Sequence, residues 1–296
     1  MSLTSAYRGR LAPSPTGYLH LGHARTFWTA QKRASDAHGT LILRNDDLDR
    51  ARCRAEFAEA ALEDLRWLGL RWSEGPDAGG PHAPYAQSER LTIYQTAFEQ
   101  LRATGLIYPC KCSRKEIAAA LSAPHIGDDE PIYPGTCRPH ERTVSTDPRA
   151  GINWRFRLKA GETITFIDGH FGLQSATCGV DFGDILIWRK DDFPSYQFAC
   201  VIDDTLMRIT EVVRGADLIA STFRQLALYR AMDWPIPAFY HCPLVADTAG
   251  TRLAKRDDAL SIRTLRERGK TPEQVVAAMP AAPTACNPGS PRHEVQ

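Results

Sequence analysis

The chain has 296 residues, with 36 Lys and Arg against 35 Asp and Glu, so its formal net charge at pH 7 is only +1. Apolar residues make up 43% of it, and no apolar run approaches the length that crosses a bilayer, which argues against a membrane protein. The balanced charge also excludes an overall field that attracts polyanions, so any contact with nucleic acid has to be local.

Residues 8 to 44 alternate between strand and helix patterns. A short apolar stretch at Arg10–Ala12 precedes a Pro- and Gly-rich turn, a helix from about Gly22 to Ala37 and a strand at Thr40–Arg44. This order predicts a βαβ unit with parallel strands. Two further helices are expected near 58–68 and 91–101, both covering a sheet, the second of them ending before Gly105.

The character of the sequence changes at Leu106, and we interpret residues 106–184 as an insertion. Between Ile152 and Lys159 apolar residues alternate with Asn or basic ones, which predicts a half-buried strand with a basic edge. We expect Thr163–Ile167 to pair with that strand.

The parallel-sheet pattern resumes after the insertion. We expect strands at Asp184–Trp188, Ile209–Arg214 and Tyr240–Ala246, helices at Tyr196–Asp203 and Ser221–Met232, and helix starts at Ser261 and Thr271-Pro272. Residues 1–105 and 185–246 would then form the two halves of one Rossmann-like parallel sheet in an α/β fold. Residues 247–280 would add a loop and C-terminal helices, and residues 281–296 are expected to be disordered.

The strongest motif lies on the turn between the first strand and the first helix. It reads Arg10-Leu-Ala-Pro-Ser-Pro-Thr-Gly-Tyr-Leu-His-Leu-Gly-His23. The start of a helix offers free N–H groups and the positive end of its dipole, which favour a phosphate, and a glycine permits close approach of the backbone. His20 and His23 can donate to phosphate oxygens there. A Walker-type phosphate loop is absent from the sequence.

This motif resembles the HIGH signature of the class I aminoacyl-tRNA synthetases, and its surroundings resemble the glutamyl branch. A second stretch, Arg252-Leu-Ala-Lys-Arg256, resembles the KMSKS loop of the same class. The resemblance implies His20, His23 and Lys255 as catalytic residues and His20, Gly22, His23, Arg252 and Lys255 as ATP contacts. Arg252 replaces the first lysine of the loop and Ala254 its serine, so the contact with ATP depends mainly on Lys255.

The glutamyl enzymes also bind their amino acid through segments that this chain resembles, Leu43–Asp49 and Asp192–Asp217. The resemblance implies a glutamate site made of Arg10, Leu11, Ala12, Pro13, Ser14, Asp46, Tyr196 and Arg214. Arginines suit the two carboxylates of glutamate, and Asp46 suits its ammonium group. The family usually has glutamate where this chain has Asp46.

Cysteines cluster in the insertion as Cys110-x-Cys112 and Tyr133-x-x-x-Cys137. Zinc needs four ligands, usually Cys or His, and tyrosine is an unusual fourth, so His140 and His125 are alternatives. A subgroup of short glutamyl enzymes carries the same Cys and Tyr pattern, which implies Cys110, Cys112, Tyr133 and Cys137. The first ten residues lack the features of a secretion signal, so we expect a cytoplasmic protein with its other cysteines as free thiols.

The resemblance extends from about Gly9 to Met279, and few residues follow the lysine loop. The chain therefore resembles the glutamyl-Q tRNA(Asp) synthetases, a family made of the catalytic core alone, with an inserted zinc-binding, acceptor-type subdomain and a helical C-terminal segment. This implies a monomer that activates L-glutamate with ATP, Mg²⁺ and one structural Zn²⁺, and transfers it to queuosine in the anticodon of tRNA(Asp). Alternatives are a truncated synthetase that charges the tRNA 3′ end and a non-catalytic tRNA-binding paralogue.

Overall fold

Two pairs of parallel strands form the middle of the molecule. The computed structural model describes residues 6–112, 132–244 and 261–277. In it β1 (Arg8–Leu11) runs parallel to β2 (Thr40–Leu43), and β8 (Glu211–Gly215) runs parallel to β9 (Ala238–Cys242). The pairs meet where Thr210 N donates to Arg8 O at 2.9 Å. Because α1 (Leu21–Asp36) connects β1 to β2, the predicted βαβ unit is confirmed.

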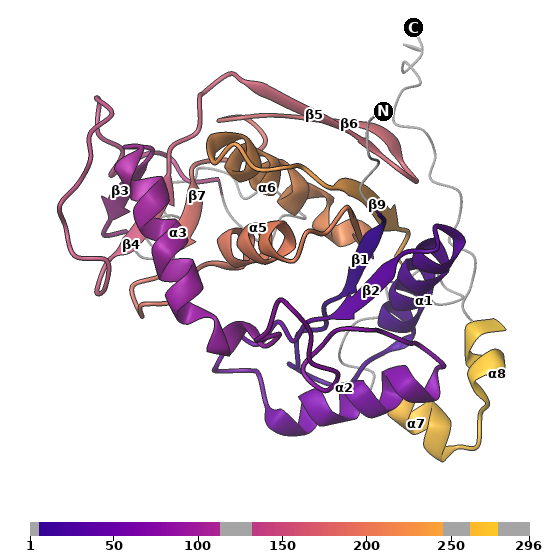
Figure 1. The fold of residues 1–296 in the computed structure, drawn as a ribbon. Coiled ribbons are helices and arrows are strands. Elements are labelled where there is room, and N and C mark those ends of the chain that lie inside the picture. The colour runs from indigo at the N-terminus through magenta and orange to yellow at the C-terminus, as the bar shows by residue number, and fades with distance from the viewer. Residues whose placement is uncertain (1–5, 113–131, 245–260, 278–296) are drawn as a thin grey trace, which may run out of the picture.

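Helices pack on both faces of this parallel sheet (Figure 1). Val213 of β8 lies in a core cluster with Ala24 and Phe27 of α1. Its neighbour Val212 lies in a second cluster with residues of α5 (Tyr196–Leu206) and α6 (Ile219–Ala231). Neighbouring residues of a strand point to opposite faces, so each face of the sheet has its own core. This is the α/β architecture that the sequence predicts.

A second, antiparallel sheet contains β3 (Ile107–Cys110), β4 (Asn153–Phe156) and β7 (Ile185–Trp188). The helix α3 (Leu91–Ala103) packs on it, with the Phe98 ring 5.2 Å from both Trp154 and Trp188. The sequence interpretation was wrong about β7, because this strand pairs antiparallel with β4 and does not resume the parallel sheet. A short, almost fully apolar strand fits a buried sheet of either kind.

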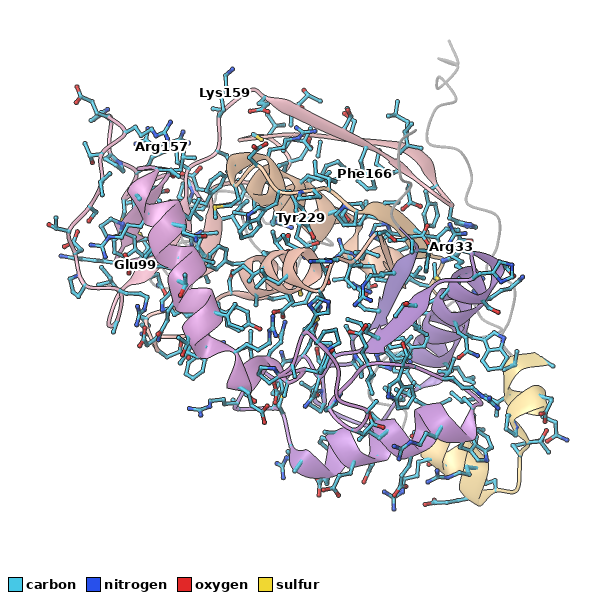
Figure 2. The ribbon with its side chains drawn as sticks, in the orientation of Figure 1. Arg33, Glu99, Arg157, Lys159, Phe166 and Tyr229 are labelled. Carbon is cyan, nitrogen blue, oxygen red and sulfur yellow. The ribbon has the colours of Figure 1, made fainter. Side chains whose placement is uncertain are left out.

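The strand β5 (Thr163–Asp168) forms a long hairpin with β6 (Gly172–Thr177) and reaches the parallel sheet at Asp168, which pairs with Phe239 of β9. The expected pairing of β5 with β4 is therefore wrong. Phe166 explains the docking of the hairpin, since its ring lies 5.3 Å from Phe223 of α6 and 5.7 Å from Phe239 (Figure 2). Burial of these rings favours β9 over β4 as the neighbour of β5.

The remaining helices are α2 (Ala55–Trp67), α7 (Ile262–Glu267), α8 (Pro272–Ala277) and the short 3₁₀ turns Gln87–Glu89 and Ala216–Leu218. Ser261 caps α7 and Pro272 begins α8, so both predicted helix starts are confirmed. The last sheet strand begins earlier than predicted, at Ala238, and Val245, Ala246 and the tail 281–296 lie outside the described residues. Within the described ranges, no helix combines the length and apolarity needed to span a bilayer.

Asp64 of α2 is a buried charge close to α7. Its side chain has an exposed fraction of 0%, and its two carboxylate oxygens lack hydrogen bonds to described residues. Arg266 Nη1 lies 3.5 Å from Asp64 Oδ1. Burial raises the pKa of Asp64 to about 6, although Arg266 opposes this. The ionised carboxylate is therefore less stable in the folded protein than in the unfolded chain.

We expect Asp64→Asn to stabilise the protein at pH 8 but not at pH 4. A pKa raised from 3.8 to about 6 corresponds to a destabilisation of up to about 3 kcal/mol at pH values above the folded pKa. This cost fades as the pH falls from 6 towards 3.8, where the folded carboxyl is protonated. Urea unfolding at both pH values measures the difference. As a control, Glu63→Gln at the exposed pair with Arg266 should change stability by less than about 1 kcal/mol. A gain that is equal at both pH values would contradict the explanation.

Candidate active site

The first motif places two histidines at the start of α1. His20 precedes the helix, and its Nδ1 accepts a hydrogen bond from Gly22 N at 3.1 Å. His23 Nδ1 accepts from His20 N at 3.3 Å, and the two rings lie with their centroids 3.8 Å apart. Because Nδ1 is an acceptor in each ring, a neutral imidazole carries its proton on Nε2. In this tautomer Nε2 is the donor atom of each ring.

Gly22 allows this arrangement because a side chain has no room there. A Cβ on Gly22 would lie 2.9 Å from His20 Cε1 and 3.1 Å from His20 Nδ1. The backbone N–H groups of the first turn and the helix dipole favour negative charge at the same place. His20, Gly22 and His23 are thus brought together at the start of α1, where a phosphate group is favoured.

Arg252 and Lys255, the predicted residues of the lysine loop, lie outside the described residues, as does His125. The chain is described again from Ser261, which forms an isolated antiparallel bridge with His20. Ile262 N donates to Leu19 O at 2.7 Å. The sequence that follows the lysine loop is therefore fixed directly beside the first motif.

Arg10 and Arg214 belong to one buried charged cluster, with exposed fractions of 6% and 5%. Arg10 Nη1 donates to Val213 O at 3.0 Å, while its Nε lies 3.5 Å from Asp204 Oδ1 and lacks a hydrogen bond to any described residue. Burial acts to raise the pKa of Asp204, but Arg44 and Arg10 lower it more, so its pKa lies below the ordinary value. Two arginines therefore lie in one buried cluster with an ionised aspartate.

Tyr196 lies between this cluster and the surface. It is the first residue of α5 and has an exposed fraction of 39%. Its hydroxyl is close enough to Arg214, Asp46 and Arg10 for their charges to act on its pKa. Although part of the residue is exposed, its hydroxyl is buried, and this burial is the main reason that its pKa is raised. The phenol therefore stays protonated and can donate a hydrogen bond.

Asp46 has a partner inside the protein, which the sequence interpretation did not include. Arg44 Nε donates to Asp46 Oδ1 at 2.6 Å, and Arg44 Nη2 donates to Oδ2 at 3.3 Å. The third nitrogen, Nη1, donates to Asp204 Oδ1 at 2.7 Å. Burial raises the pKa of Asp46, while Arg44 opposes this. An ammonium group bound at Asp46 would share the carboxylate with Arg44.

Backbone contacts join the first motif to Asp46. Leu11 O accepts from Arg44 N at 2.8 Å, and Pro13 O accepts from Asp46 N at 3.0 Å. Leu11 and Pro13 are buried, Ala12 is partly buried, and Ser14 is exposed. Of the predicted glutamate-binding residues, Leu11 and Pro13 therefore shape the backbone around the cluster, while Ser14 reaches the surface.

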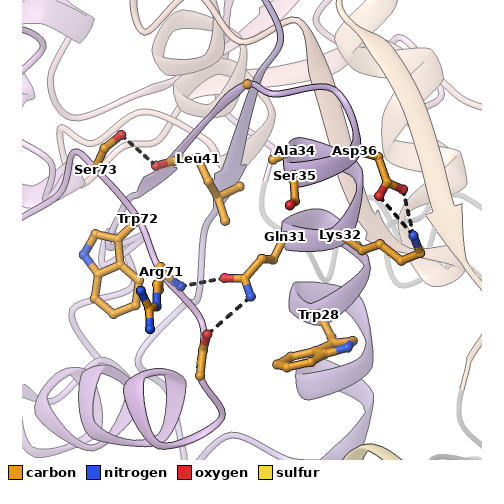
Figure 3. A pocket seen from close by; sticks show the side chains of 12 residues that line it. Trp28, Gln31, Lys32, Ala34, Ser35, Asp36, Leu41, Arg71, Trp72 and Ser73 are labelled. Carbon is orange, nitrogen blue, oxygen red and sulfur yellow. Dashed lines mark hydrogen bonds and ion pairs between the residues drawn. The ribbon is translucent and has the colours of Figure 1, made fainter.

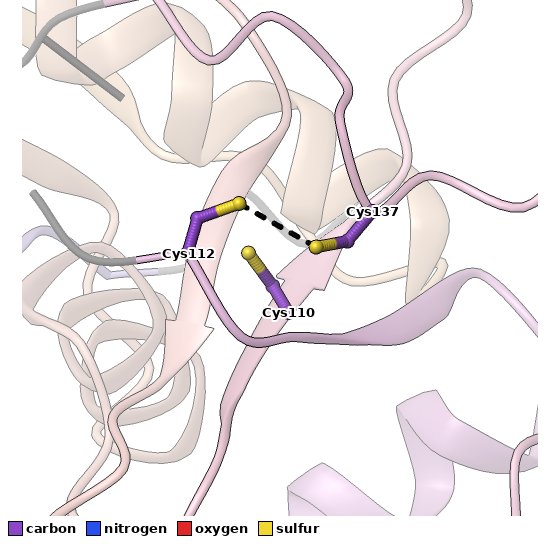
Figure 4. A group of neighbouring side chains, drawn as sticks. All are labelled: Cys110, Cys112 and Cys137. Carbon is purple, nitrogen blue, oxygen red and sulfur yellow. Dashed lines mark hydrogen bonds between the residues drawn. The ribbon is translucent and has the colours of Figure 1, made fainter. Parts of the chain in front are cut away.

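The predicted metal ligands lie together (Figure 4). The sulfur atoms of Cys110, Cys112 and Cys137 lie within 4.8 Å of one another, and the Cys112 and Cys137 sulfurs are 3.5 Å apart. Tyr133 Oη accepts from Cys110 Sγ at 3.4 Å and lies 3.8 Å from Cys112 Sγ. Within the described part of the chain, His140 is not in this group.

Tyr133 is held in place by Arg155, whose guanidinium lies 3.9 Å from the ring centroid and donates to Asp184 O at 2.8 Å. Arg155 is buried, so the predicted basic edge of this strand is wrong at that position. Arg157 is also occupied, because it donates to the carbonyl groups of Pro139, His140 and Glu141. These contacts hold the segment that carries Tyr133 and Cys137 against β4.

A hollow of about 640 Å³ lies elsewhere, between α1 and residues 69–73 (Figure 3). Gln31 lines this hollow and joins α1 to residues 69–73, because its side chain accepts from Arg71 N at 2.6 Å and donates to Gly69 O at 3.3 Å. Trp28 and Trp72 line its sides. None of the predicted site residues lines this hollow, so it is separate from the buried charged cluster.

Sequence reasoning missed Arg44, Asp204 and His241 as parts of the site. Arg44 lies two residues before Asp46, and residues at that spacing in an extended segment share a face, which is a usable signal. Asp204 belongs to a recognised segment but had no role assigned. His241 is the register partner of Arg214 on the neighbouring strand, and that relationship appears only once β8 and β9 are paired.

The comparisons with known proteins agree with this fold. Residues 6–281 match the family model of the tRNA synthetases class I (E and Q), catalytic domain. A glutamyl-Q tRNA(Asp) synthetase of Symbiobacterium thermophilum is 49% identical over 90% of this chain and 84% of that protein. One of Nitratidesulfovibrio vulgaris is 47% identical over 88% and 82%.

Among solved structures, a glutamate tRNA ligase from Elizabethkingia meningosepticum in complex with its amino acid matches with a TM-score of 0.74 and 33% identity. The match covers 86% of this chain and 52% of the ligase. The chain belongs to the class I aminoacyl-tRNA synthetases of the E and Q group, a family of ligases, and within it to the family of the glutamyl-Q tRNA(Asp) synthetases.

Proposed function

We propose that this protein activates L-glutamate with ATP to form glutamyl-adenylate and transfers the glutamyl group to the queuosine base in the anticodon of tRNA(Asp). The observation that carries the proposal is the buried cluster of Arg10, Arg214 and Asp46. Glutamate has two carboxylates and one ammonium group, so the arginines and the aspartate match its charges. The ammonium would approach the Asp46 carboxylate next to Arg44.

The chemical step needs alignment and charge compensation from the protein. A carboxylate oxygen of glutamate attacks the α-phosphorus of ATP, and the bond between that phosphorus and the pyrophosphate oxygen breaks. His20 and His23, through Nε2, and the first-turn N–H groups of α1 would bind phosphate oxygens. Lys255 would add a positive charge, and Mg²⁺ bound to ATP would compensate further phosphate charge. The nucleophile belongs to the substrate, so the enzyme supplies orientation.

The choice of acceptor rests on the relatives. The chain spans 84% and 82% of the two proteins named glutamyl-Q tRNA(Asp) synthetase, against 52% of the glutamate tRNA ligase structure. Attachment at the 3′ end of tRNA is the other acceptor chemistry that the glutamate ligase relatives suggest. Both acceptors need the same adenylate, so the amino-acid site does not distinguish them.

Two assays test the proposal in sequence. The first measures exchange of labelled pyrophosphate into ATP with glutamate, aspartate or glutamine, and we expect glutamate to be strongly preferred. Glutamine lacks one negative charge, so it would leave a buried arginine unpaired. The second supplies labelled glutamate and tRNA(Asp) with queuosine or with guanine at the wobble position. Ribonuclease cleavage then shows which part of the tRNA carries the labelled glutamate. Label in the anticodon fragment of queuosine tRNA alone supports the proposal, and label at the 3′ end overturns the acceptor assignment.

We also propose that Cys110, Cys112, Tyr133 and Cys137 bind one structural zinc ion. Two thiolates of a zinc tetrahedron lie about 3.8 Å apart, because each Zn–S bond is about 2.3 Å long. The 3.5 Å between the Cys112 and Cys137 sulfurs fits that geometry. Burial acts to raise the pKa of Cys137, but hydrogen bonds from Tyr133 and Lys111 N lower it to about 7, which favours the thiolate.

Purified protein is expected to contain about one zinc ion per chain, which elemental analysis measures. Removal of the ion with a chelator should lower the melting temperature, because zinc joins Cys110 and Cys112, at the end of β3, to the segment with Cys137. Cys112→Ser should lose zinc, whereas Cys53→Ser, a free cysteine outside the cluster, should keep it. Metal-free protein with an unchanged melting temperature after chelation would contradict the proposal.

A further inference from the structure

Three neighbouring strands place a row of polar side chains behind Arg214. Arg214 of β8 is the register partner of His241 of β9, and Asp168 ends β5 on the other side of β9. Paired residues of neighbouring parallel strands point to the same face, so these side chains meet. Asp168 and His241 are buried, and the centroid of the His241 ring lies 6.1 Å from that of Phe166 and 6.3 Å from that of Phe239.

The distances join these side chains into one hydrogen-bonded chain. His241 Nδ1 lies 2.6 Å from Asp168 Oδ2. Arg214 Nε donates to His241 Nε2 at 3.1 Å, and Arg214 Nη2 donates to Thr222 Oγ1 at 2.7 Å. Among the described residues, these are the hydrogen bonds of the Arg214 side chain. They hold one edge of the planar guanidinium, so the direction of its remaining N–H groups is also fixed.

The chemistry of arginine sets the tautomer of His241. A guanidinium only donates, so His241 Nε2 has to accept and its proton sits on Nδ1, facing Asp168. Burial lowers the pKa of His241, and Arg214 lowers it further, while Asp168 opposes this, so the ring is neutral at pH 7. Burial acts to raise the pKa of Asp168, but the hydrogen bonds from His241, Phe171 N and His170 N together lower it below its ordinary value, so Asp168 is ionised. An ionised Asp168, a neutral His241 and a cationic Arg214 are therefore the charge states that this chain of hydrogen bonds requires.

We propose that His241 is a positioning residue for amino-acid recognition. Asp168 orients His241, and His241 in turn holds the Arg214 guanidinium in the orientation that binds a substrate carboxylate. The Asp168–His241–Arg214 chain acts before substrate arrives, because its atoms are already in contact. A guanidinium held in advance loses less conformational freedom on binding. Thr222 of α6 fixes the orientation of the same plane. This inference rests on the proposed function, in which Arg214 contacts a carboxylate of glutamate.

Kinetics of pyrophosphate exchange test the proposal. We expect His241→Leu to raise the KM for glutamate by about 10- to 100-fold, because a hydrogen bond to a charged group is lost. The KM for ATP should stay the same, since ATP is expected at the start of α1. His241→Gln should restore part of the affinity, because its amide can accept from Arg214 and donate to Asp168. Asp168→Asn should give an intermediate KM for glutamate.

The matched control is His170→Leu, an exposed histidine on the same hairpin as Asp168, which should leave both KM values unchanged. Thermal melts check that each variant is folded, and His241→Gln and Asp168→Asn carry the test if His241→Leu unfolds. An unchanged KM for glutamate in His241→Leu, or an equal rise of both KM values, would overturn the positioning role while the proposed function stands. Absence of glutamate-dependent exchange in the unmodified protein would instead refute the proposed function.

Discussion

Replacing Arg214 with methionine is expected to lower kcat/KM for glutamate in pyrophosphate exchange by about 100- to 1,000-fold. Arg214 is 5% exposed and would lose a charged contact with a substrate carboxylate inside a buried cluster. Truncating one partner of such a pair costs about 3 to 4 kcal/mol, and each 1.4 kcal/mol is tenfold. Methionine keeps most of the volume of the side chain, so the change tests the charge more than the packing.

Arg230→Met is the matched control for Arg214→Met. Arg230 lies on α6 with 41% of its side chain exposed and forms a long ion pair of 3.8 Å with Glu162. Exposed pairs contribute less than about 1 kcal/mol, so kcat/KM should change by less than about fivefold. If Arg214→Met keeps kcat/KM within tenfold of the unmodified protein while melting normally, Arg214 does not bind the substrate carboxylate.

Local sequence patterns predicted the elements of this fold better than they predicted strand partners. The helix start at Ser261 depends on a cap that bonds to Thr264 N within one turn, so it is visible in the sequence. The partner of β5 is different, because it depends on Phe166 meeting Phe223 and Phe239, which lie far away in the chain. Alternation identifies a strand and its buried face but does not identify its neighbour.

The same distinction applies to the site. His20 and His23 bond to each other and to Gly22 within a few residues, so one motif contains the whole arrangement. Arg214 was predicted from its own segment, but its anchors His241 and Asp168 come from two other strands. Residues that position a functional side chain are found by the fold, because their sequence neighbours give no sign of the contact.

Arg44 connects the predicted site to the stability of the protein. It is completely buried and donates to both Asp46 and Asp204, and it lies 3.7 Å from Asp203. Asp203 forms a separate ion pair with Arg90, whose Nε lies 2.7 Å from Asp203 Oδ1. Asp46 therefore depends on Arg44 for charge compensation, whereas Asp204 is compensated by Arg44 together with Arg10.

Arg44→Met is expected to lower the free energy of unfolding at pH 7 by about 3 to 5 kcal/mol, because it leaves buried carboxylates without their partner. This is a large share of the roughly 5 to 15 kcal/mol that stabilises a typical domain, so urea unfolding should show it clearly. Without Arg44 the folded pKa of Asp46, which is already above its ordinary value, rises further, and the lowered pKa of Asp204 rises as well. The loss should therefore be full at pH 7 and shrink as the pH falls and the carboxyls take up protons.

Arg52→Met gives the same substitution at an exposed pair, where Arg52 lies 2.7 Å from Asp49 with 69% of its side chain exposed. It should lower stability by less than about 1 kcal/mol at any pH. Adding Asp204→Asn to Arg44→Met should recover part of the loss, because one uncompensated charge is removed. Equal effects of Arg44→Met and Arg52→Met would mean that water reaches Asp46 and Asp204. The glutamate site would then lack the dry, charged environment that makes an unpaired arginine costly, and with it the proposed basis for rejecting glutamine.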